Sequence, residues 1–384
     1  MELQLPPDDD PRRQTVRAWI AEHPQSSPTE LAEAGYVVPH WPRPWGLDAD
    51  PLEQLIIDQE LKRAGVSRPI NPIGTGHCGP ILVMHGNEEQ KQRYIPPMLS
   101  GEEMWCQLFS EPGAGSDLAD VATRADRQGD VYVINGQKTW TSLGHVAKYG
   151  ILLVRTNPDV PKHQGLSYFI IPMDLPGIEI RPIVDMTGWH NFNDVFFTDV
   201  HLPVENLIGD ENKGWDLARE TLANERVTLS RPGAQWGWGP TARDLVDLVR
   251  ERGVVPHHVL RQRLAQLYVE GEILRVYNLR TVAAAISGRP GPMASVRKAL
   301  ADPHGQHIFR LGKDLAGAQG MYKDTGPLGA DPTWWSSGFE FAPALTIGGG
   351  TSEVLRDIIG ERILGLPREP DPDVGKPWRD TRHG

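Results

Sequence analysis

Two segments in the first half of the chain carry residue types that could bind a ligand. In the first, residues 106–118, a short apolar run leads into a glycine- and proline-rich turn at 112–115, with the hydroxyl groups of Ser110 and Ser116 on either side. Glycine leaves backbone N–H groups open to a ligand because it carries no side chain. Taken alone, this pattern indicates a turn, and a purely structural role is the more common one for such a turn.

The second segment, residues 132–142, ends in Trp140, Thr141 and Ser142. The dipeptide Asn-Gly at 135–136, after an alternating apolar run, predicts a β-hairpin turn. The hairpin would present a flat aromatic side chain with two small hydroxyl groups beside it. In the alternative interpretation, Trp140 is a core residue and the hydroxyl groups belong to solvated turns.

A third candidate lies near the C-terminus, where the glycines at 348–350 precede Thr351. Glycines leading into a helix that Thr351 caps form a helix start whose N–H groups can face an anion or a cofactor. The alternative is an ordinary capped helix after a flexible loop.

Glu225 is a candidate general base, and Arg226 follows it in a segment with helical spacing. Adjacent helix residues do not face each other, so Arg226 need not neutralise Glu225. A carboxylate buried beside a ligand loses hydration and becomes a stronger base. The alternative is a solvated carboxylate on a helix surface.

The elements expected to position these residues form three parts and a tail. Residues 1–103 show helical spacing and capping patterns. Residues 104–211 contain short runs rich in Val, Ile and aromatic residues, which predict a small β-barrel or sandwich. Helical spacing returns over 212–366 and predicts a helical bundle. The Pro-, Asp- and Arg-rich tail, 367–384, is expected to be disordered or draped on a neighbour.

Prolines and caps refine the helical boundaries. Ser27 and Asn87 are predicted N-caps. Pro96 and Pro97 are expected to disrupt the helix that Asn87 begins, and Pro303 is a predicted kink or break in a later helix.

Composition excludes several classes of function. The 384 residues exceed a usual single core, so two or three domains are expected. A formal net charge of −11 argues against nucleic acid as a partner. No apolar run approaches the roughly 18 residues that span a bilayer, so we expect no membrane association. Cys78 and Cys106 show no metal-binding or redox spacing, which fits a reducing cytoplasm, and no metal site is expected.

From about Trp41 to about Arg368 the sequence resembles the acyl-CoA dehydrogenases, whose middle domain carries an almost identical pair of segments to 106–118 and 132–142. The resemblance implies an α+β fold, with an N-terminal helical domain, a central small β-barrel or sandwich domain and a C-terminal helical bundle. It also implies FAD, because no side chain can accept a hydride. By resemblance, the cofactor-binding residues are Gln107, Phe109, Ser110, Gly115, Ser116, Trp140, Thr141, Ser142, Thr351 and Glu353.

The resemblance further implies dehydrogenation of an acyl-CoA thioester to the 2-enoyl-CoA, with electrons passed to an electron-transferring flavoprotein. The family commonly carries its catalytic glutamate at the position of Gly349, but some members carry it on an earlier helix, immediately before an arginine. Glu225-Arg226 matches that second arrangement, so Glu225 is the predicted catalytic residue. The predicted substrate-binding residues are Ser116, Arg226, Gly349 and Gly350.

For assembly, the resemblance implies a cytoplasmic homodimer or homotetramer. Two departures from the family's sequence pattern favour an alternative assembly. The family's Arg-x-x-Phe-Gly segment has no match in residues 250–254, and Asp314 stands where relatives often have glutamine and would repel a pyrophosphate unless neutralised. The alternative is a half-site or non-catalytic subunit of an unlike-subunit, hetero-oligomeric dehydrogenase acting on bulky or steroid-derived acyl-CoA. A third hypothesis, a helical scaffold that has lost its flavin, is disfavoured because both segments are intact.

Overall fold

A computed structural model of the protein describes residues 6–229, 233–251, 257–286, 293–321 and 333–381. The contacts within the chain separate it into two units. The first comprises Met1–Asp185, His190–Asn224 and Pro370–Gly384, and the second comprises Met186–Trp189 and Glu225–Glu369. The domain boundaries expected after residues 103, 211 and 366 stay a prediction. None of the described helices is both long enough and apolar enough to cross a membrane.

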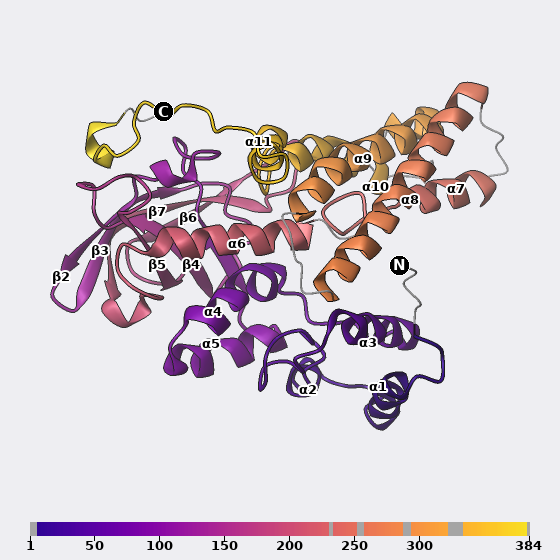
Figure 1. Ribbon diagram of the computed structural model, residues 1–384, viewed down its shortest axis with the longest axis horizontal. Helices are drawn as coiled ribbons and strands as arrows, with labels where there is room; N and C mark the ends of the chain where they lie inside the picture. The colour runs from indigo at the N-terminus through magenta and orange to yellow at the C-terminus, as the bar shows by residue number, and fades with distance from the viewer. Residues whose placement is uncertain (1–5, 230–232, 252–256, 287–292, 322–332, 382–384) are drawn as a thin grey trace. The chain divides into compact units, whose positions relative to one another are not determined.

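The first unit begins with helices (Figure 1): α1 (Pro11–Glu22), α2 (Pro28–Glu33), α3 (Pro51–Ala64), the π-helix η1 (Gly74–Cys78), α4 (Gly79–His85) and α5 (Glu88–Ser100). The predicted caps Ser27 and Asn87 are confirmed. Each accepts a hydrogen bond from the backbone N–H three residues later and takes part in a capping box.

The predicted end of α5 is wrong, because the helix continues through Pro96 and Pro97 to Ser100. A proline in a helix removes one backbone hydrogen bond and crowds the preceding turn. Here the last turn buries Ile95, Met98 and Leu99 almost completely, and that packing outweighs the missing bonds.

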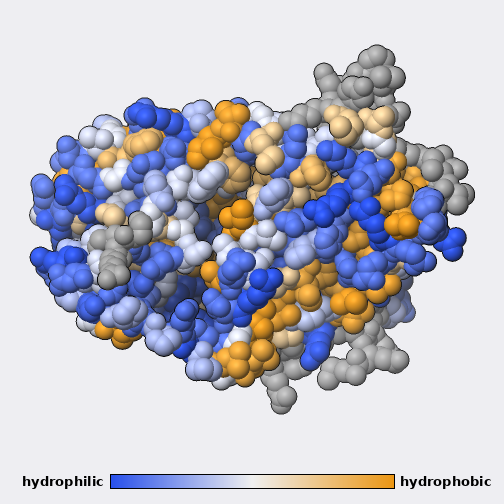
Figure 2. Space-filling model, turned by 90° about the horizontal axis from the view of Figure 1, so that it is seen from above, coloured by the Kyte–Doolittle hydropathy of each residue, from blue (hydrophilic) through white to orange (hydrophobic). Residues whose placement is uncertain are grey.

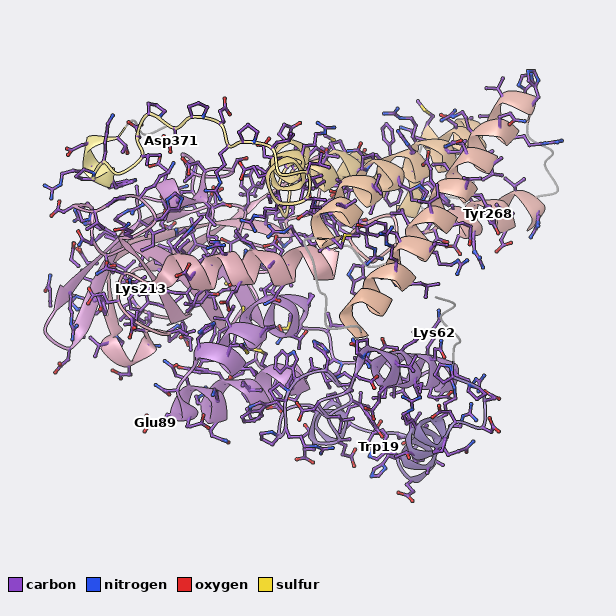
Figure 3. The ribbon with its side chains drawn as sticks, in the orientation of Figure 1. Trp19, Lys62, Glu89, Lys213, Tyr268 and Asp371 are labelled. Atoms are coloured by element: carbon purple, nitrogen blue, oxygen red, sulfur yellow. The ribbon has the colours of Figure 1, made fainter. Side chains whose placement is uncertain are left out.

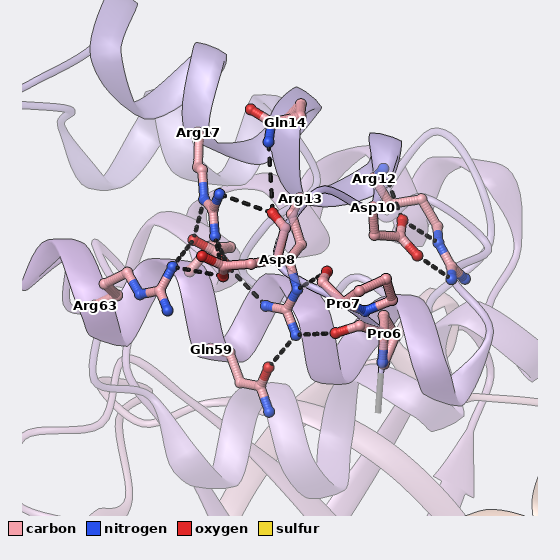
Figure 4. A network of polar contacts seen from close by, with 11 residues as sticks. Pro6, Pro7, Asp8, Asp10, Arg12, Arg13, Gln14, Arg17, Gln59 and Arg63 are labelled. Atoms are coloured by element: carbon pink, nitrogen blue, oxygen red, sulfur yellow. Dashed lines mark hydrogen bonds and ion pairs between the residues drawn. The ribbon is translucent and has the colours of Figure 1, made fainter. Parts of the chain in front are cut away.

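Helices α1 and α3 are joined by a buried polar network (Figure 4). The guanidinium group of Arg13 donates to Glu60 Oε1 at 2.6 Å and to Gln59 Oε1 at 2.6 Å. Arg17 donates to Glu60 Oε2 at 2.7 Å. Trp19 of α1, labelled in Figure 3, adds an edge-on contact with Tyr36 at a centroid distance of 4.9 Å. The network satisfies a carboxylate that the helices almost completely bury.

A β-sheet follows, made of β1 (Trp105–Leu108), β2 (Arg124–Gln128), β3 (Val131–Lys138), β4 (Tyr149–Arg155), β5 (Leu166–Pro172), β6 (Ile178–Ile183) and β7 (Phe192–Pro203). The strand order is β1-β4-β2-β3-β7-β6, and β5 pairs with β4. β1 is parallel to β4, and β2 meets β4 at one residue pair, Arg124 and Arg155. Helices before the sheet and helices after it confirm the α+β fold class.

Strand β4 shows why its sequence is a continuous apolar run. Ile151 and Leu153 belong to the hydrophobic core shared with the N-terminal helices, whereas Leu152 and Val154 belong to the core enclosed by the sheet. Successive side chains point to opposite faces, so a strand covered on both faces is apolar throughout.

The hairpin predicted at Asn135-Gly136 is wrong, because β3 runs straight through both residues. The register of β3 against β7 shifts between Ile134 and Gly136, which marks a β-bulge. Gly136 has φ +150°, and a Cβ there would lie 2.7 Å from Thr123 Cα. Glycine is needed at this close approach, and one strand's sequence cannot distinguish that need from a turn.

The tail is also different from the prediction, because it is ordered against its own chain. Figure 1 shows it (yellow) returning to the strands of the first unit. Trp378 donates through Nε1 to Asp120 Oδ1 at 2.7 Å and through its backbone N–H to the carbonyl of Val160 at 2.9 Å. The guanidinium group of Arg155 lies 4.5 Å from the Trp378 ring. A tryptophan held by a cation and a carboxylate overrides the disorder that the tail's composition suggested.

The helix α6 (Gly214–Leu229) leads into the second unit, whose helices are α7 (Ala242–Glu251), α8 (His258–Ile286), α9 (Met293–Ala316), α10 (Thr333–Phe341) and α11 (Ser352–Arg362). The short η5 (Ala342–Thr346) precedes the glycine loop. The core of the second unit includes Leu245, Ile308, Phe309 and Leu345. Pro303 does not split α9, which continues to Ala316.

Candidate active site

The turn after β1 presents one predicted segment. Phe109 is buried, whereas Ser110 is half-buried and Ser116 is exposed. Glu111 and Ala114 exchange two backbone hydrogen bonds of 3.0 Å and close the turn. A Cβ at Gly115 would have no atom within 4 Å, so the turn is open on that side. Such an open, hydrogen-bonded turn can accept a ligand against its backbone.

The exit of β3 presents the other segment. The Trp140 side chain is 59% exposed, large for an aromatic ring, and its backbone has φ +57°. A left-handed tryptophan is unusual and is concentrated at functional sites. Thr141 is fully buried, and its Oγ1 has no hydrogen-bond partner among the described residues. Ser142 is half-buried.

The two segments lie side by side. The backbone N–H of Thr139, just before Trp140, donates to the carbonyl of Ser110 at 2.9 Å. Lys138 donates to the carbonyl of Phe109, also at 2.9 Å. The structure therefore brings together the two segments that the sequence singled out, and their cofactor roles stay predictions.

Two residues that sequence reasoning missed support these segments. Asn193 is fully buried, and both its backbone N–H and its Nδ2 donate to the carbonyl of Thr141 at 3.0 Å. His77, nearly buried in the π-helix η1, has Nδ1 3.0 Å from Oε1 of the predicted site residue Gln107. The π-helix, a form often found at functional sites, is the signal for His77, but only the structure shows it.

In the second unit, Glu225 and Gly349 come together. Gly349 has φ +67°, and a Cβ built on it would lie 3.3 Å from Glu225 Oε1 and 3.1 Å from Lys298 Cε. The same Cβ would overlap Leu229 Cδ1, one helical turn beyond Glu225. The carboxylate of α6 therefore lies beside the backbone of the glycine loop, and no side chain fits at position 349 unless Leu229 moves.

A buried lysine–aspartate ion pair lies next to this loop. Lys298 of α9 is fully buried and donates to Asp302 Oδ2 at 2.5 Å and to the carbonyl of Leu345 at 3.2 Å. Gln306 donates to the carbonyl of Ala342 at 3.1 Å. One face of α9 thus holds η5, which leads into the glycine loop.

The other predicted residues of the second unit have different settings. Thr351 caps α11, accepting a hydrogen bond from the N–H of Val354 at 3.3 Å. Glu353 is exposed, with 75% of its side chain accessible. Arg226 is half-buried, and burial lowers its pKa while the charge of Glu225 opposes that shift. Gly350 has φ +97° and ends the loop.

Asp314 is paired in this structure. Arg263 Nη1 lies 2.6 Å from Asp314 Oδ2, so the carboxylate that would repel a pyrophosphate has a cation beside it. The segment 250–254, which lacks the Arg-x-x-Phe-Gly motif, lies partly outside the described residues. No group of three or more His, Cys, Asp or Glu side chains in the described part of the chain is arranged to hold a metal ion.

Three profiles of one enzyme family match the chain. They are the acyl-CoA dehydrogenase N-terminal domain over residues 10–102, the middle domain over 106–200 and the C-terminal domain over 212–364. Acyl-CoA dehydrogenase IpdE1 of Mycobacterium tuberculosis (strain ATCC 25618 / H37Rv) is 37% identical over 340 residues, 88% of this chain and 87% of the relative. The chain belongs to the acyl-CoA dehydrogenase family.

Other similarities agree with this assignment. Acyl-CoA dehydrogenase FadE34 of the same organism is 40% identical over 340 residues, but this chain, 88% of which is covered, spans 46% of its length. Among solved structures, the Tcur3481-Tcur3483 steroid ACAD has a TM-score of 0.81 and 30% identity, covering 96% of this chain and 100% of that one. The ChsE4-ChsE5 complex from Mycobacterium tuberculosis has a TM-score of 0.79 and 30% identity, with the same coverage.

The residues present suit the flavin that this family of oxidoreductases uses. Trp140 offers an exposed aromatic face, and the unpartnered Oγ1 of Thr141 needs a hydrogen-bonding group. A flat heterocycle with polar edges meets both needs.

Proposed function

We propose that this acyl-CoA dehydrogenase family member catalyses FAD-dependent α,β-dehydrogenation of an acyl-CoA thioester to the 2-enoyl-CoA, with Glu225 as the base. The observation that carries the proposal is the position of Glu225 Oε1, 3.3 Å from the point where a Cβ of Gly349 would lie. By the family resemblance, position 349 is where many relatives carry their catalytic glutamate. A carboxylate reaching that neighbourhood from α6 can do the same work.

The proposed reaction removes two hydrogens. Glu225 takes the α-proton, and the electron pair of that C–H bond moves toward the thioester carbonyl. Backbone N–H groups of the glycine loop 348–350 stabilise the charge that develops on the carbonyl oxygen. FAD, when bound, would supply the acceptor for the β-hydrogen as hydride, a role that no side chain of the protein can fill. The double bond forms as the hydride leaves, and Glu225 holds the proton.

The first unit is proposed to bind the flavin. Gln107, Phe109 and Ser110 would line one part of it, together with Gly115 and Ser116. Trp140, Thr141 and Ser142 would lie against the other part, with the Ser142 hydroxyl near the hydride-accepting nitrogen. Support comes from the hydrogen bond between Thr139 and Ser110, which keeps both segments at one place.

The substrate residues have unequal support. Gly349 and Gly350 belong to the loop beside Glu225, and Arg226 is half-buried on the same helix. Ser116 is exposed at the end of the open turn. Thr351 and Glu353 are proposed to face the cofactor from the start of α11, where Glu353 is largely exposed.

The first experiment is the absorbance spectrum of the purified chain, with and without added FAD. An oxidised-flavin spectrum near one equivalent per site is expected. A folded chain that stays colourless in excess FAD, alone and with any sibling subunit, would contradict the proposed enzyme function.

The second experiment is stopped-flow flavin reduction with two probes, octanoyl-CoA and the CoA thioester of a steroid carboxylic acid. Glu225→Gln keeps the shape but removes the base, so reduction should slow by about 10²–10⁴. Glu220→Gln is the matched control, because Glu220 lies on the same helix and pairs with His85 at 2.7 Å. Near-normal reduction by Glu225→Gln would place the base elsewhere.

The alternative is a subunit of a hetero-oligomeric dehydrogenase for steroid-derived acyl-CoA. It is favoured by two similar structures, the Tcur3481-Tcur3483 steroid ACAD and the ChsE4-ChsE5 complex. Hydrophobic residues lie among hydrophilic ones on the surface shown in Figure 2, and α8 exposes Val259, Val269, Ile273 and Val276.

Sedimentation of the chain alone and with a co-expressed sibling separates a homodimer or homotetramer from a hetero-oligomer. Transfer of electrons to an electron-transferring flavoprotein is tested by adding that protein to the reduced enzyme.

A further inference from the structure

Lys138 and Glu111 form a buried ion pair at the junction of the two flavin-facing segments. Lys138 is the last residue of β3 and is fully buried, and Glu111 is 9% exposed. The ammonium group donates to Glu111 Oε1 at 2.7 Å and to the carbonyl of Phe109 at 2.9 Å. A buried ammonium group is stable only when hydrogen-bond acceptors and an opposite charge surround it, and here both come from the turn and the residue before it.

The carboxylate of Glu111 extends the junction to a third segment. Its Oε2 accepts a hydrogen bond from the N–H of Ala122 at 2.7 Å, and its Oε1 accepts one from the N–H of Thr123 at 3.0 Å. The Thr123 hydroxyl donates in turn to the carbonyl of Gln137, beside Lys138. The turn, the strand before Trp140 and the segment 122–123 are therefore joined through one carboxylate.

The charges of the pair are matched to their surroundings. Burial opposes ionisation of Glu111, but Lys138 and the backbone N–H donors outweigh it and hold the pKa of Glu111 below its usual value. The carboxylate is therefore ionised at neutral pH and has a charged donor and two backbone donors in fixed directions. A contact of this kind specifies the spacing of the segments it joins.

We propose that Lys138 and Glu111 are positioning residues, which fix the turn 110–116 against the segment 139–142 and so shape the surface that receives the flavin. The pair itself does not touch the reacting atoms. This inference deepens the proposed function and rests on it for the identity of the ligand. The positioning itself can be measured without any ligand.

A buried ion pair can also serve stability alone, and the first unit provides a matched control. Arg13 and Glu60 form a buried pair between α1 and α3, with an Nη1–Oε1 distance of 2.6 Å. Arg13→Met breaks that pair away from both flavin-facing segments. Lys138→Met, compared with Arg13→Met, therefore separates a local effect on the segments from a general loss of stability.

The first measurement is hydrogen–deuterium exchange of the flavin-free chain. In Lys138→Met, peptides covering 109–116 and 139–142 should exchange at least about tenfold faster, because their shared anchor is lost. In Arg13→Met the rise should be confined to α1 and α3. Glu111→Gln, which keeps the side-chain shape, repeats the test if Lys138→Met does not fold. Exchange that rises no more in the two segments than elsewhere in the first unit, or unchanged exchange in the two segments, would overturn the proposal.

The second measurement is FAD affinity, by titrating flavin-free protein and following flavin fluorescence. Lys138→Met should weaken FAD binding by about 10–100-fold, and Arg13→Met should leave it within about twofold. The double variant Lys138→Met/Glu111→Leu replaces both charges with apolar groups, so it should regain stability without regaining affinity. Recovery of both together would mean that the pair acts through stability alone. Failure of the wild-type chain to bind FAD would contradict the proposed function, while the exchange result would still decide the positioning.

Discussion

The two units each bury a lysine–carboxylate pair beside a glycine-containing segment, and the pairs differ in sequence separation and in the donors to the carboxylate. In the first unit, Lys138 and Glu111 are 27 residues apart and join a strand to a turn. In the second, Lys298 and Asp302 are one helical turn apart on α9. Both lysines also donate to the backbone carbonyl of a neighbouring segment, Lys138 to residue 109 and Lys298 to residue 345.

The difference lies in what else the carboxylate accepts. Glu111 receives two backbone N–H donors besides Lys138, and its pKa is lowered although burial opposes this. For Asp302, burial is the largest influence and raises the pKa to about 6, with Lys298 offsetting only part of it. Two pairs of the same chemical type therefore differ in the pH at which their carboxylates ionise, because backbone donors favour the ionised form of Glu111.

The largest expected effect is the difference in the free energy of unfolding between Lys138→Met and Lys298→Met. Lys138→Met leaves the Glu111 charge buried with fewer partners, which should cost about 3–5 kcal/mol in the free energy of unfolding. Lys298→Met should cost roughly 1–3 kcal/mol, because Asp302 can take up a proton instead. Urea denaturation at pH 7 measures both. The control is Lys148→Met in the exposed pair with Asp174, where little change is expected because solvent screens the two charges. Equal costs for Lys138 and Lys298 would contradict the comparison.

The next prediction uses pH. Because the pKa of Asp302 is raised from 3.8 to about 6, the folded state binds more protons than the unfolded state between these values. The stability of the wild type relative to Asp302→Asn should therefore fall by on the order of 2–3 kcal/mol as pH rises from 4 to 7.

The contribution of Glu111 to stability should change with pH in the opposite direction. Its lowered pKa contributes stability above the ordinary value of 4.5, and that contribution is lost as pH falls through the folded-state pKa. The wild type relative to Glu111→Gln should thus lose its advantage on acidification from pH 5 toward pH 3. Denaturation midpoints of the wild type, Asp302→Asn and Glu111→Gln from pH 3 to pH 7 test both signs. Slopes of the same sign would show that the two carboxylates do not differ as described.

The smallest expected effect compares the two glycine segments. Gly349→Ala places a Cβ against Leu229 at φ +67°, so a loss of about 1–3 kcal/mol is expected. Gly115→Ala meets open space and should change the flavin-free protein by less than about 0.5 kcal/mol. Thermal unfolding of both variants without FAD is the measurement. If Leu229→Ala added to Gly349→Ala restores no stability, the steric explanation fails.

Those steric limits also bear on the base. Many relatives carry their catalytic glutamate at position 349, so a glutamate introduced there could replace Glu225 only if the pocket had room. The overlap with Leu229 shows that the room is taken, so Gly349→Glu in a Glu225→Gln background should not recover activity. Space at a glycine depends on what packs against it, and Leu229 lies 120 residues away in the chain.

Much of this protein was determined by local sequence. The caps at Ser27 and Asn87, the helical spacing of α8 and the apolar runs of the strands depend on neighbours within a few residues. The paired segments 106–118 and 132–142 could likewise be recognised from sequence, because their residue types match those of a known family over a short span.

Only the tertiary structure decided the rest. Asn135-Gly136 is strand because β7 pairs on both sides of it, with the extra residue of the bulge in β7, and Trp378 is ordered because Asp120 and Arg155 contact it. The buried pairs of Lys138 and Lys298 leave no sequence signal, since a lysine in a strand or a helix is usually solvated. Each of these outcomes depends on groups brought together from distant parts of the chain, and their burial, rather than their spacing in sequence, sets the energy.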